Sequence, residues 1–463
     1  MHACKRLVAL SIVAAIGLIS CSASGPPRHL ATHPSAAPST RSTSPAPSNA
    51  GEWPTYQHDS QRTGDAASGP NPKAVAEKWT SPTLDGDVYA QPLIANGQVI
   101  VATENDSVYS LDMNNGKIQW RRHLGDPIAS SQLPCGNIDP SGITGTPVID
   151  VPNGTVYAVA FVQPGHHVLA AMDLDTGHLR WTRPADDPGM DPLVQQQRAA
   201  LLLDGGRVYV AYGGLFGDCG EYHGWVTSVA ADGTGSLTSF QVPSGRAAGI
   251  WAPGGPVSDG HGLIYVVTGN SFSSTDFDFG GAVIALDRGL HRRSYFAPSD
   301  WADLNGSDTD VGSTGPLQVP GGRVFQIGKA GVGYLLDASD LGGIGGELFH
   351  ANVCGGGAFG ANALSSNTIL VPCTDGLYAL QLESDSFRAQ WQATGIFAGP
   401  PAVGSGTAWT ITRDGALDAF DVSSGHRNFN ASLGTVTNFA APSLTKDCVF
   451  AAADRKVHAL CEP

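Results

Sequence analysis

The sequence predicts an all-β fold, an eight-bladed β-propeller with four-stranded antiparallel blades. Three observations support this prediction: a hairpin that recurs with fixed spacing, a proline that recurs ahead of apolar runs, and the composition. The chain of 463 residues contains 59 Gly and 31 Pro, and only 14% of its residues are charged. Such a composition favours many short strands joined by turns over long surface helices.

The hairpin is first seen in the stretch SVYSLDMNNGKIQW, where Asp112, Gly116 and Trp120 stand four residues apart. The same spacing returns in LAAMDLDTGHLRW and, with Phe429 as the aromatic residue, in DAFDVSSGHRNF. The Asp ends one strand and caps the turn, and the Gly supplies a positive φ. We expect the aromatic residue to return on the second strand and cover the core face.

A proline opens each repeat, which suits a strand at a sheet edge because proline cannot donate to a β ladder. It precedes an apolar strand pattern at Pro92, Pro147, Pro256, Pro316, Pro401 and Pro442. Two of the steps between these prolines, 109 and 85 residues, are double steps, and the missing repeats lie at 198–214 and 360–373. The count is therefore eight, and a period of about 40–50 residues with four strands indicates a propeller.

The last repeat ends with the chain and lacks its outer strand. The segment AVAEKWTSPTL at residues 74–84 has a tryptophan but no inner strands. We expect this N-terminal segment to complete the eighth blade, so that the propeller spans residues 53–463.

The N-terminus predicts export. Residues 1–21 combine Lys5 and Arg6 with a short apolar stretch, and the ending LISC resembles the lipobox of bacterial lipoproteins. That resemblance implies cleavage before Cys21 and a lipid on its sulfur; the alternative is an ordinary signal peptide with an incidental Cys21. Residues 22–52 are Ser, Pro and Ala with few large apolar side chains, which predicts a disordered tether. We therefore expect an exported protein, lipid-anchored to the outer side of a bacterial membrane.

The hairpin, the opening EWPTYQHDSQRTG at residues 52–64 and the count of eight resemble the pyrroloquinoline-quinone-type propeller repeat family. That superfamily includes quinoprotein dehydrogenases and the non-enzymatic barrel-assembly lipoprotein of bacterial outer membranes. The resemblance covers about residues 52–463. It implies the fold and leaves the function open.

Six cysteines remain after the signal peptide and Cys21 are set aside, in a compartment that permits disulfides. The propeller arrangement selects one pairing out of the fifteen that are possible. It predicts three bridges: Cys135–Cys219, Cys354–Cys373 and Cys448–Cys461. The alternative is that these cysteines are reduced and buried.

Two stretches resemble cofactor-binding segments of the quinoprotein dehydrogenases. In GIWAPGGPVSDGHGLIYVVTGN, the resemblance implies that Asn270 ligates calcium beside the quinone and that Trp251 matches a family tryptophan. In IGKAGVGYLLD it implies that Lys329 contacts the quinone. The alternative for each is a strand end or a turn without a ligand.

A third stretch, SDWADLNGSDTDVGSTGPL, lies where related enzymes carry a catalytic aspartate. Asp300 and Asp303 are the candidates, with Asp308 and Asp310 nearby. An aspartate base accepts an alcohol proton while calcium polarises the quinone. The alternative is a solvated acidic loop.

Several features favour a non-enzymatic protein. We find no match for the family's calcium-binding glutamate and no vicinal cysteine pair, and the net charge of −15 suits neither a tricarboxylated quinone nor nucleic acid. The preferred hypothesis is a monomeric, membrane-anchored scaffold that binds a protein or another envelope component, without a cofactor. The alternative is a dehydrogenase that uses pyrroloquinoline quinone and calcium to oxidise an alcohol or a sugar hydroxyl.

Overall fold

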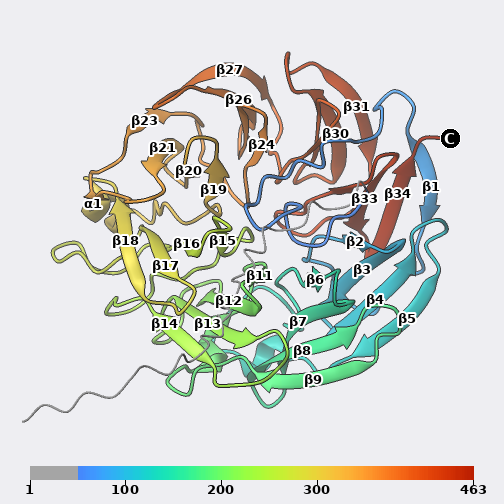
Figure 1. Ribbon diagram of the computed structural model, residues 1–463, viewed down its shortest axis with the longest axis horizontal. Helices are drawn as coiled ribbons and strands as arrows, with labels where there is room; N and C mark the ends of the chain where they lie inside the picture. The colour runs from blue at the N-terminus through green and yellow to red at the C-terminus, as the bar shows by residue number, and fades with distance from the viewer. Residues whose placement is uncertain (1–50) are drawn as a thin grey trace, which may run out of the picture. The chain divides into compact units, whose positions relative to one another are not determined.

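The computed structural model describes residues 51–463. The predicted signal peptide, Cys21 and the predicted tether lie outside the described residues, except for Gly51 and Glu52 at the end of the tether. In the described part of the chain, eight sheets, each with four antiparallel strands, stand around a common axis (Figure 1). The predicted eight-bladed propeller is therefore confirmed.

The first four blades follow one another along the chain, each running from an inner to an outer strand. Their strands are β2 (Leu93–Ala95), β3 (Gln98–Thr103), β4 (Ser107–Asp112) and β5 (Ile118–His123); β6 (Val148–Asp150), β7 (Thr155–Val162), β8 (His166–Asp173) and β9 (Leu179–Pro184); β11 (Leu202–Asp204), β12 (Arg207–Gly214), β13 (Trp225–Ala230) and β14 (Thr238–Gln241); and β15 (Val257–Ser258), β16 (Leu263–Val267), β17 (Val283–Asp287) and β18 (Arg292–Ala297). Blades three and four each gain a short fifth strand, β10 (Gln195–Gln196) and β22 (Gly343–Ile344).

The remaining blades repeat this order. Their strands are β19 (Leu317–Val319), β20 (Arg323–Ile327), β21 (Val332–Asp337) and β23 (Phe349–Asn352); β24 (Ala363–Ser365), β25 (Thr368–Cys373), β26 (Gly376–Leu382) and β27 (Phe387–Thr394); β28 (Ala402–Gly404), β29 (Thr407–Ile411), β30 (Ala416–Asp421) and β31 (Arg427–Ser432); and β32 (Ser443–Leu444), β33 (Cys448–Ala453), β34 (Lys456–Cys461) and β1 (Ala76–Thr80). Short helices lie between strands at η1 (Ser130–Gln132), η2 (Pro192–Val194) and α1 (Trp301–Gly306).

The ring closes as the sequence predicts, because β1 is the outer strand of blade eight. It pairs antiparallel with β34, with Ala76 opposite Cys461 and Thr80 opposite His458 (Figure 1). Joining the two ends of the chain in one sheet leaves no unpaired blade edge between them.

The repeated glycine and tryptophan join neighbouring blades rather than cover the core of their own blade. The indole of Trp120 in blade one lies on the turn of blade two, where a Cβ on Gly177 would stand 2.5 Å from the ring. Trp120 also donates its indole N–H to the carbonyl of Leu174 at 3.0 Å. The glycine is therefore required because the next blade's turn must approach the ring closely. The other junctions of this type in the described residues are Trp79 on Gly116, Trp181 on Gly233 and Trp391 on Gly425.

The strands alternate in direction, so the turns divide between two faces. Turns between the first and second strands and between the third and fourth strands lie on what we call the lower face. Turns between the second and third strands, and the loops that lead to the next blade, lie on the upper face. The repeated Asp–Gly turns therefore belong to the lower face.

Residues 53–66, which we call the plug, occupy the central channel. The plug runs antiparallel to β2 at Trp53 and parallel to β28 at Asp65, so it enters and leaves on the lower side. Its backbone is hydrogen-bonded to inner strands of several blades, including Ile94, Ile149 and Leu364 (Figure 1). At its turn, the guanidinium of Arg62 donates to the carbonyls of Gly254 and Leu201. The channel is therefore filled from the lower side by this segment.

Three disulfides join the pairs that the propeller arrangement predicts: Cys135–Cys219, Cys354–Cys373 and Cys448–Cys461. The first connects the loop before blade two to the second-to-third-strand loop of blade three. The second joins the loop before blade six to the end of β25, and the third joins β33 to β34 within blade eight. The first two bridges therefore fasten loops of the upper face.

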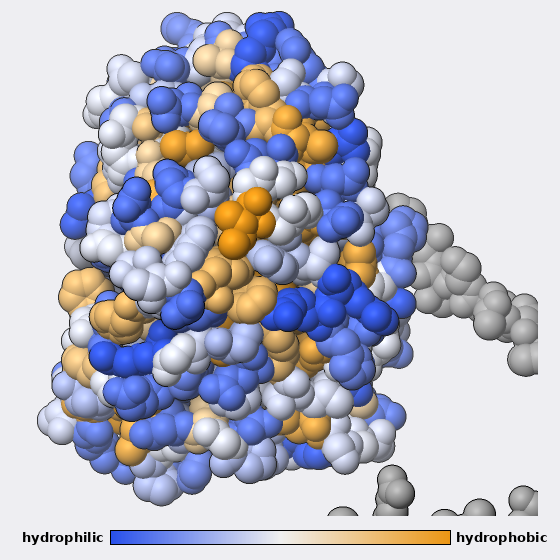
Figure 2. Space-filling model, turned by 90° about the vertical axis from the view of Figure 1, so that its left-hand side faces the viewer, coloured by the Kyte–Doolittle hydropathy of each residue, from blue (hydrophilic) through white to orange (hydrophobic). Residues whose placement is uncertain are grey.

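The outer wall carries polar and apolar residues intermixed. Figure 2 shows this for one side of the propeller, where apolar residues are interspersed with hydrophilic ones. Among the described residues, no helix is long and apolar enough to cross a membrane.

Candidate functional site

The upper end of the channel is surrounded by the loops that lead into the inner strands. In blades one, three, six and eight, the residue four places before the inner strand is large: Tyr89, Arg198, Phe359 and Phe439. Blades four and seven contribute Trp251 and Phe397 from nearby positions of the same loops. We call these six residues, together with Arg413, the mouth.

The aromatic rings of the mouth meet across the channel axis. Phe359 of blade six and Phe439 of blade eight stack face to face, with centroids 5.5 Å apart and an interplanar angle of 3°. Phe359 also lies 6.4 Å from Trp251 of blade four and 6.4 Å from Phe397 of blade seven. Since Trp251 and Phe439 come from blades that are not adjacent to blade six, Phe359 links both sides of the channel opening.

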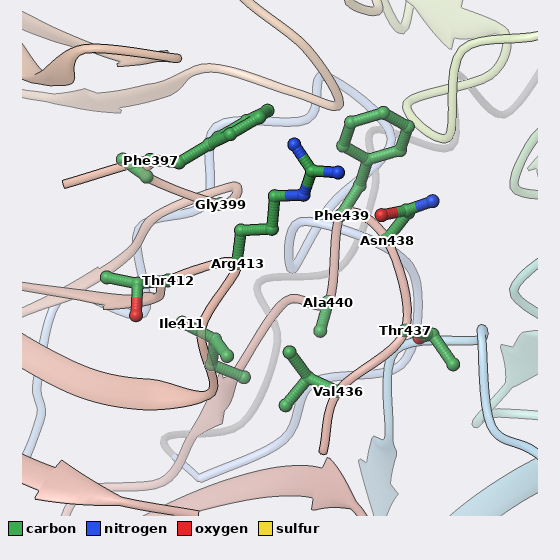
Figure 3. Close-up of a pocket in the computed structure, with 11 residues that line it drawn as sticks. Phe397, Gly399, Ile411, Thr412, Arg413, Val436, Thr437, Asn438, Phe439 and Ala440 are labelled. Carbon is green, nitrogen blue, oxygen red and sulfur yellow. The ribbon is translucent and has the colours of Figure 1, made fainter. Parts of the chain in front are cut away.

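Two arginines lie on the aromatic faces of the mouth. The Arg198 guanidinium lies 5.1 Å from the centroid of Phe439 and 5.3 Å from that of Tyr89. The Arg413 guanidinium lies 5.4 Å from the centroid of Phe397, and Figure 3 shows it between the rings of Phe397 and Phe439. No carboxylate of residues 51–463 forms an ion pair with either arginine. Arg198 also donates to the backbone carbonyl of Asn438 at 2.8 Å. Both positive charges are therefore held in place without a carboxylate and are left to pair with an anionic group.

Below the mouth, Tyr56 of the plug forms the floor. Its ring is 2% exposed and clusters with Ala200, Ala361 and Ala441, one from each of three blades around the axis. Burial raises the pKa of the Tyr56 hydroxyl, although the charges of Arg62 and Arg198 act in the opposite direction. The hydroxyl has no hydrogen-bond partner in the described part of the chain. The channel is thus a shallow funnel, open above and blocked below.

On the side of blades four and five, Trp251, Asp310 and Lys329 come together. Lys329 Nζ lies 3.3 Å from Asp310 Oδ2 and 2.7 Å from Asp308 Oδ1, and 5.9 Å from the indole centroid of Trp251. Burial raises the pKa of Asp310 to about 6, although Lys329 opposes the shift. Burial disfavours the charge of Lys329, but Asp310 and Asp308 raise its pKa. Lys329 therefore stays protonated, and its charge is balanced by two carboxylates.

The site residues predicted from the sequence separate into those at the cluster of Trp251, Asp310 and Lys329 and those away from it. Trp251 and Lys329 belong to this cluster, and Asn270 is next to it: a Cβ on the preceding Gly269 would lie 3.3 Å from Asp310 Oδ2. Asp300 and Asp303 are not brought to it. They are exposed at the start of α1, which Figure 1 shows at the outer rim of the propeller. Asp310, which the sequence analysis noted only as a neighbour, takes the position beside Lys329.

Two buried acids on the side of blades one and two were missed by the sequence analysis. Glu104, 1% exposed, accepts from the backbone N–H of Gly142 at 2.7 Å and from Thr144 at 3.1 Å. Burial raises the pKa of Glu104 to about 7 and that of neighbouring Asp106 to about 9. One oxygen of each carboxylate lacks a described hydrogen bond. In the sequence these residues are two acids in a turn between strands. The sequence alone does not show whether the side chains in such a turn are buried or exposed.

The arrangement does not fit a calcium-bound quinone. Within residues 51–463, no three His, Cys, Asp or Glu side chains are grouped closely enough to hold a metal ion. In the blade-three loop, Asp218 accepts from the hydroxyl of Tyr222 at 2.6 Å. The rings of Trp251 and Phe359 are tilted by 48°, so they do not form a parallel slot for a planar group. We therefore derive no catalytic step through such a cofactor.

Comparison with known proteins agrees with this fold. The family model described as outer membrane protein assembly factor BamB matches residues 71–289. The matched residues cover blades one to three and most of blade four of this eight-bladed propeller. A curated relative of this propeller, outer membrane protein assembly factor BamB of Yersinia pestis, is 27% identical over 139 residues. The match spans 29% of this chain and 30% of the relative, so it covers less than a third of either protein.

Solved structures resemble the propeller over most of its length. A quinohemoprotein alcohol dehydrogenase of Pseudomonas putida HK5 superposes with a TM-score of 0.69 at 14% identity, covering 89% of this chain and 80% of that one. BamB of Moraxella catarrhalis superposes with a TM-score of 0.57 at 15% identity, covering 84% of this chain and 97% of that one. At such low identity, these similarities establish the shared fold alone.

Proposed function

We propose that the protein is a monomeric, lipid-anchored scaffold on the outer side of a bacterial membrane, and that its mouth binds an acidic, aromatic segment of a cell-envelope protein. The observation that carries the proposal is the pair Arg198 and Arg413. Both guanidinium groups lie on aromatic rings at the open end of a blocked funnel, and neither forms an ion pair with a carboxylate of residues 51–463.

The chemistry of the mouth suits a peptide better than a small polar molecule. Arginine and aromatic side chains dominate the energetics of protein interfaces because they combine apolar area with fixed polar groups. A carboxylate of the partner would pair with Arg413, and an apolar side chain would lie against Phe397 and Phe439 in the pocket of Figure 3. The relationship to an outer membrane assembly factor supports an envelope partner.

Photocrosslinking in cells tests this proposal. A photoreactive amino acid replaces Asn438, which is exposed beside the mouth, or Asn114, which is exposed on a lower-face turn of blade one. We expect a discrete protein adduct from position 438 and none from position 114. The adduct should fall when the same chain carries Arg413→Met. Equal adducts from both positions, or an adduct insensitive to Arg413, would contradict a binding site at the mouth.

One observation favours the dehydrogenase as a second candidate, namely that Trp251 and Lys329 lie together beside Asp310. Mixing the purified chain with pyrroloquinoline quinone and calcium tests it. We expect no bound chromophore and no dye reduction with simple alcohols. Stoichiometric binding that Asn270→Ala abolishes would replace the scaffold proposal with this one.

A further inference from the structure

Asparagine residues that precede a glycine are chemically labile, because glycine has no side chain to shield its backbone nitrogen from the neighbouring side-chain amide. The chain has four such residues: Asn96, Asn115, Asn153 and Asn305. In a folded protein the reaction requires that the glycine nitrogen and the asparagine side chain are both free to move. The hydrogen bonds around each pair therefore decide which of the four can react.

Asn115 is exposed, but its turn is held by hydrogen bonds. It lies in the lower-face turn between β4 and β5, where the N–H of Gly116 donates to the carbonyl of Asp112 at 2.8 Å. The side chain of Asn115 accepts from the N–H of Lys117 at 3.0 Å. The attacking nitrogen and the amide that it would attack are thus both engaged.

Asn153 and Asn305 are restrained in the same way. The N–H of Gly154 donates to the carbonyl of Val151 at 3.1 Å, and the side chain of Asn153 donates to Asp150 at 2.8 Å. Asn305 is buried in α1, and its side-chain amide takes part in three hydrogen bonds. Neither side chain can therefore approach the following backbone nitrogen without losing contacts.

Asn96 differs from the other three. Asn96 and Gly97 form the exposed two-residue turn between β2 and β3, with φ values of 50° and 73° that suit such a hairpin. Within residues 51–463, neither the side chain of Asn96 nor the N–H of Gly97 forms a hydrogen bond. The carbonyl of Gly97 accepts from Met113 at 3.0 Å, but a Cβ on Gly97 would meet no atom within 4 Å. Both reacting groups are therefore free and reached by water.

We propose that Asn96 is a site of spontaneous deamidation. An exposed hairpin tip opens at little cost in free energy, which lets the nitrogen of Gly97 approach Cγ of Asn96. That nitrogen gives its proton to water and bonds to Cγ, while the bond from Cγ to the side-chain nitrogen breaks and ammonia leaves. Water then opens the resulting succinimide ring at either carbonyl, and the product is aspartate or isoaspartate. Water is the only co-reactant, and no electrons are transferred.

The modification lies next to the plug. Isoaspartate adds a carbon atom to the backbone of a turn that has only two residues between its strands. Ile94, two residues before Asn96, forms backbone hydrogen bonds of 2.8 and 2.9 Å with Trp53 of the plug. Isoaspartate at position 96 should therefore weaken the pairing of the plug with β2. Since the turn is on the lower face, this site is independent of the function proposed for the mouth.

Peptide mapping by mass spectrometry tests the proposal, after incubation of the folded full chain at pH 8 and 37 °C. The measured quantity is the rate at which each asparagine gains the mass that separates an acid from an amide. We expect Asn96 to react about tenfold faster than Asn115 or Asn153, which is the factor that one hydrogen bond of typical strength contributes. Asn305 should not react.

The same chain unfolded in guanidinium chloride is the control for local sequence, and there all four asparagines should react at similar rates. In the folded chain, Asn96→Ser should remove most of the ammonia that is released, whereas the matched variant Asn115→Ser should not. Equal rates at Asn96, Asn115 and Asn153 in the folded chain would overturn the proposal. An intact Asn96 in the folded chain, after all four residues have reacted in the unfolded chain, would also overturn it.

Discussion

On the lower face, Trp79, Trp120, Trp181 and Trp391 each cover a glycine of the next blade, whereas on the upper face the matching positions of the blades carry different residues. The place that holds Phe359 in blade six holds Thr144 in blade two and Ser313 in blade five. The difference shows that residues on the two faces have different roles. Repeated residues join the blades, while the residues that vary surround the funnel and give it one particular chemistry.

The largest effect is expected on the lower face. Gly177→Ala should lower the free energy of unfolding by about 3–4 kcal/mol, because alanine is strained at the φ of +65° and its Cβ would overlap the Trp120 ring. The control is Gly154→Ala in the same blade, with a φ of +56° and no atom closer than 3.9 Å to the new Cβ. This control should cost only about 1 kcal/mol. Urea denaturation of both variants measures the difference; equal losses would mean that the tryptophan contact contributes little.

The lower face was also the easier part to predict. The spacing of Asp112, Gly116 and Trp120 is local and recurs, so the sequence revealed the blades, their number and the closing role of β1. The partner of each tryptophan was not evident, because it belongs to the next repeat. The plug was missed for a similar reason: its partners, such as Ile94 and Leu364, are distant in sequence and follow no period.

The upper face resists prediction because its residues do not repeat. Asp300, Asp303 and Asp310 all precede the same inner strand, and spacing alone does not decide among them. The short helix α1 takes Asp300 and Asp303 to the rim, and the chain returns to the channel only at Asp310. Similarly, the mouth joins residues from seven loops, and no local motif marks Arg198 and Phe439 as neighbours.

On the upper face, substitutions of Lys329 and Arg413 show whether each cation stabilises the fold or binds a partner. Lys329→Met leaves the buried Asp310 carboxylate without its cation, so we expect a loss of about 3 kcal/mol in unfolding free energy at pH 7.5. The loss should shrink at pH 5, below the Asp310 pKa of about 6, where the neutral acid needs no partner. Thermal denaturation at both pH values measures this. A loss that is independent of pH would show that Lys329 contributes through packing instead of charge.

A smaller, pH-dependent effect is expected at Glu104. Its pKa is raised from 4.5 to about 7 in the folded state. The contribution of Glu104 to the free energy of unfolding of the parent therefore falls as the pH rises between these two values, and it does not change further at higher pH. Glu104→Gln removes this loss, and the variant should be about 2–3 kcal/mol more stable than the parent at pH 8 and equal to it at pH 4. Denaturation across pH 4–8 measures the difference. If the two curves stay parallel, the charge of Glu104 is not what limits stability.

The smallest effect on stability is expected at Arg413. Its side chain is exposed and contacts the Phe397 ring without a carboxylate partner, so Arg413→Met should change the unfolding free energy by less than about 0.5 kcal/mol. The same substitution should remove most of the crosslinked adduct at position 438, because a desolvated arginine paired with a carboxylate contributes strongly to binding. Lys329→Met and Arg413→Met each replace a cation by methionine, in second-to-third-strand turns of blades five and seven. If Arg413→Met also destabilises the fold by several kcal/mol, the upper face is another packing surface, and its variation between blades does not mark a site.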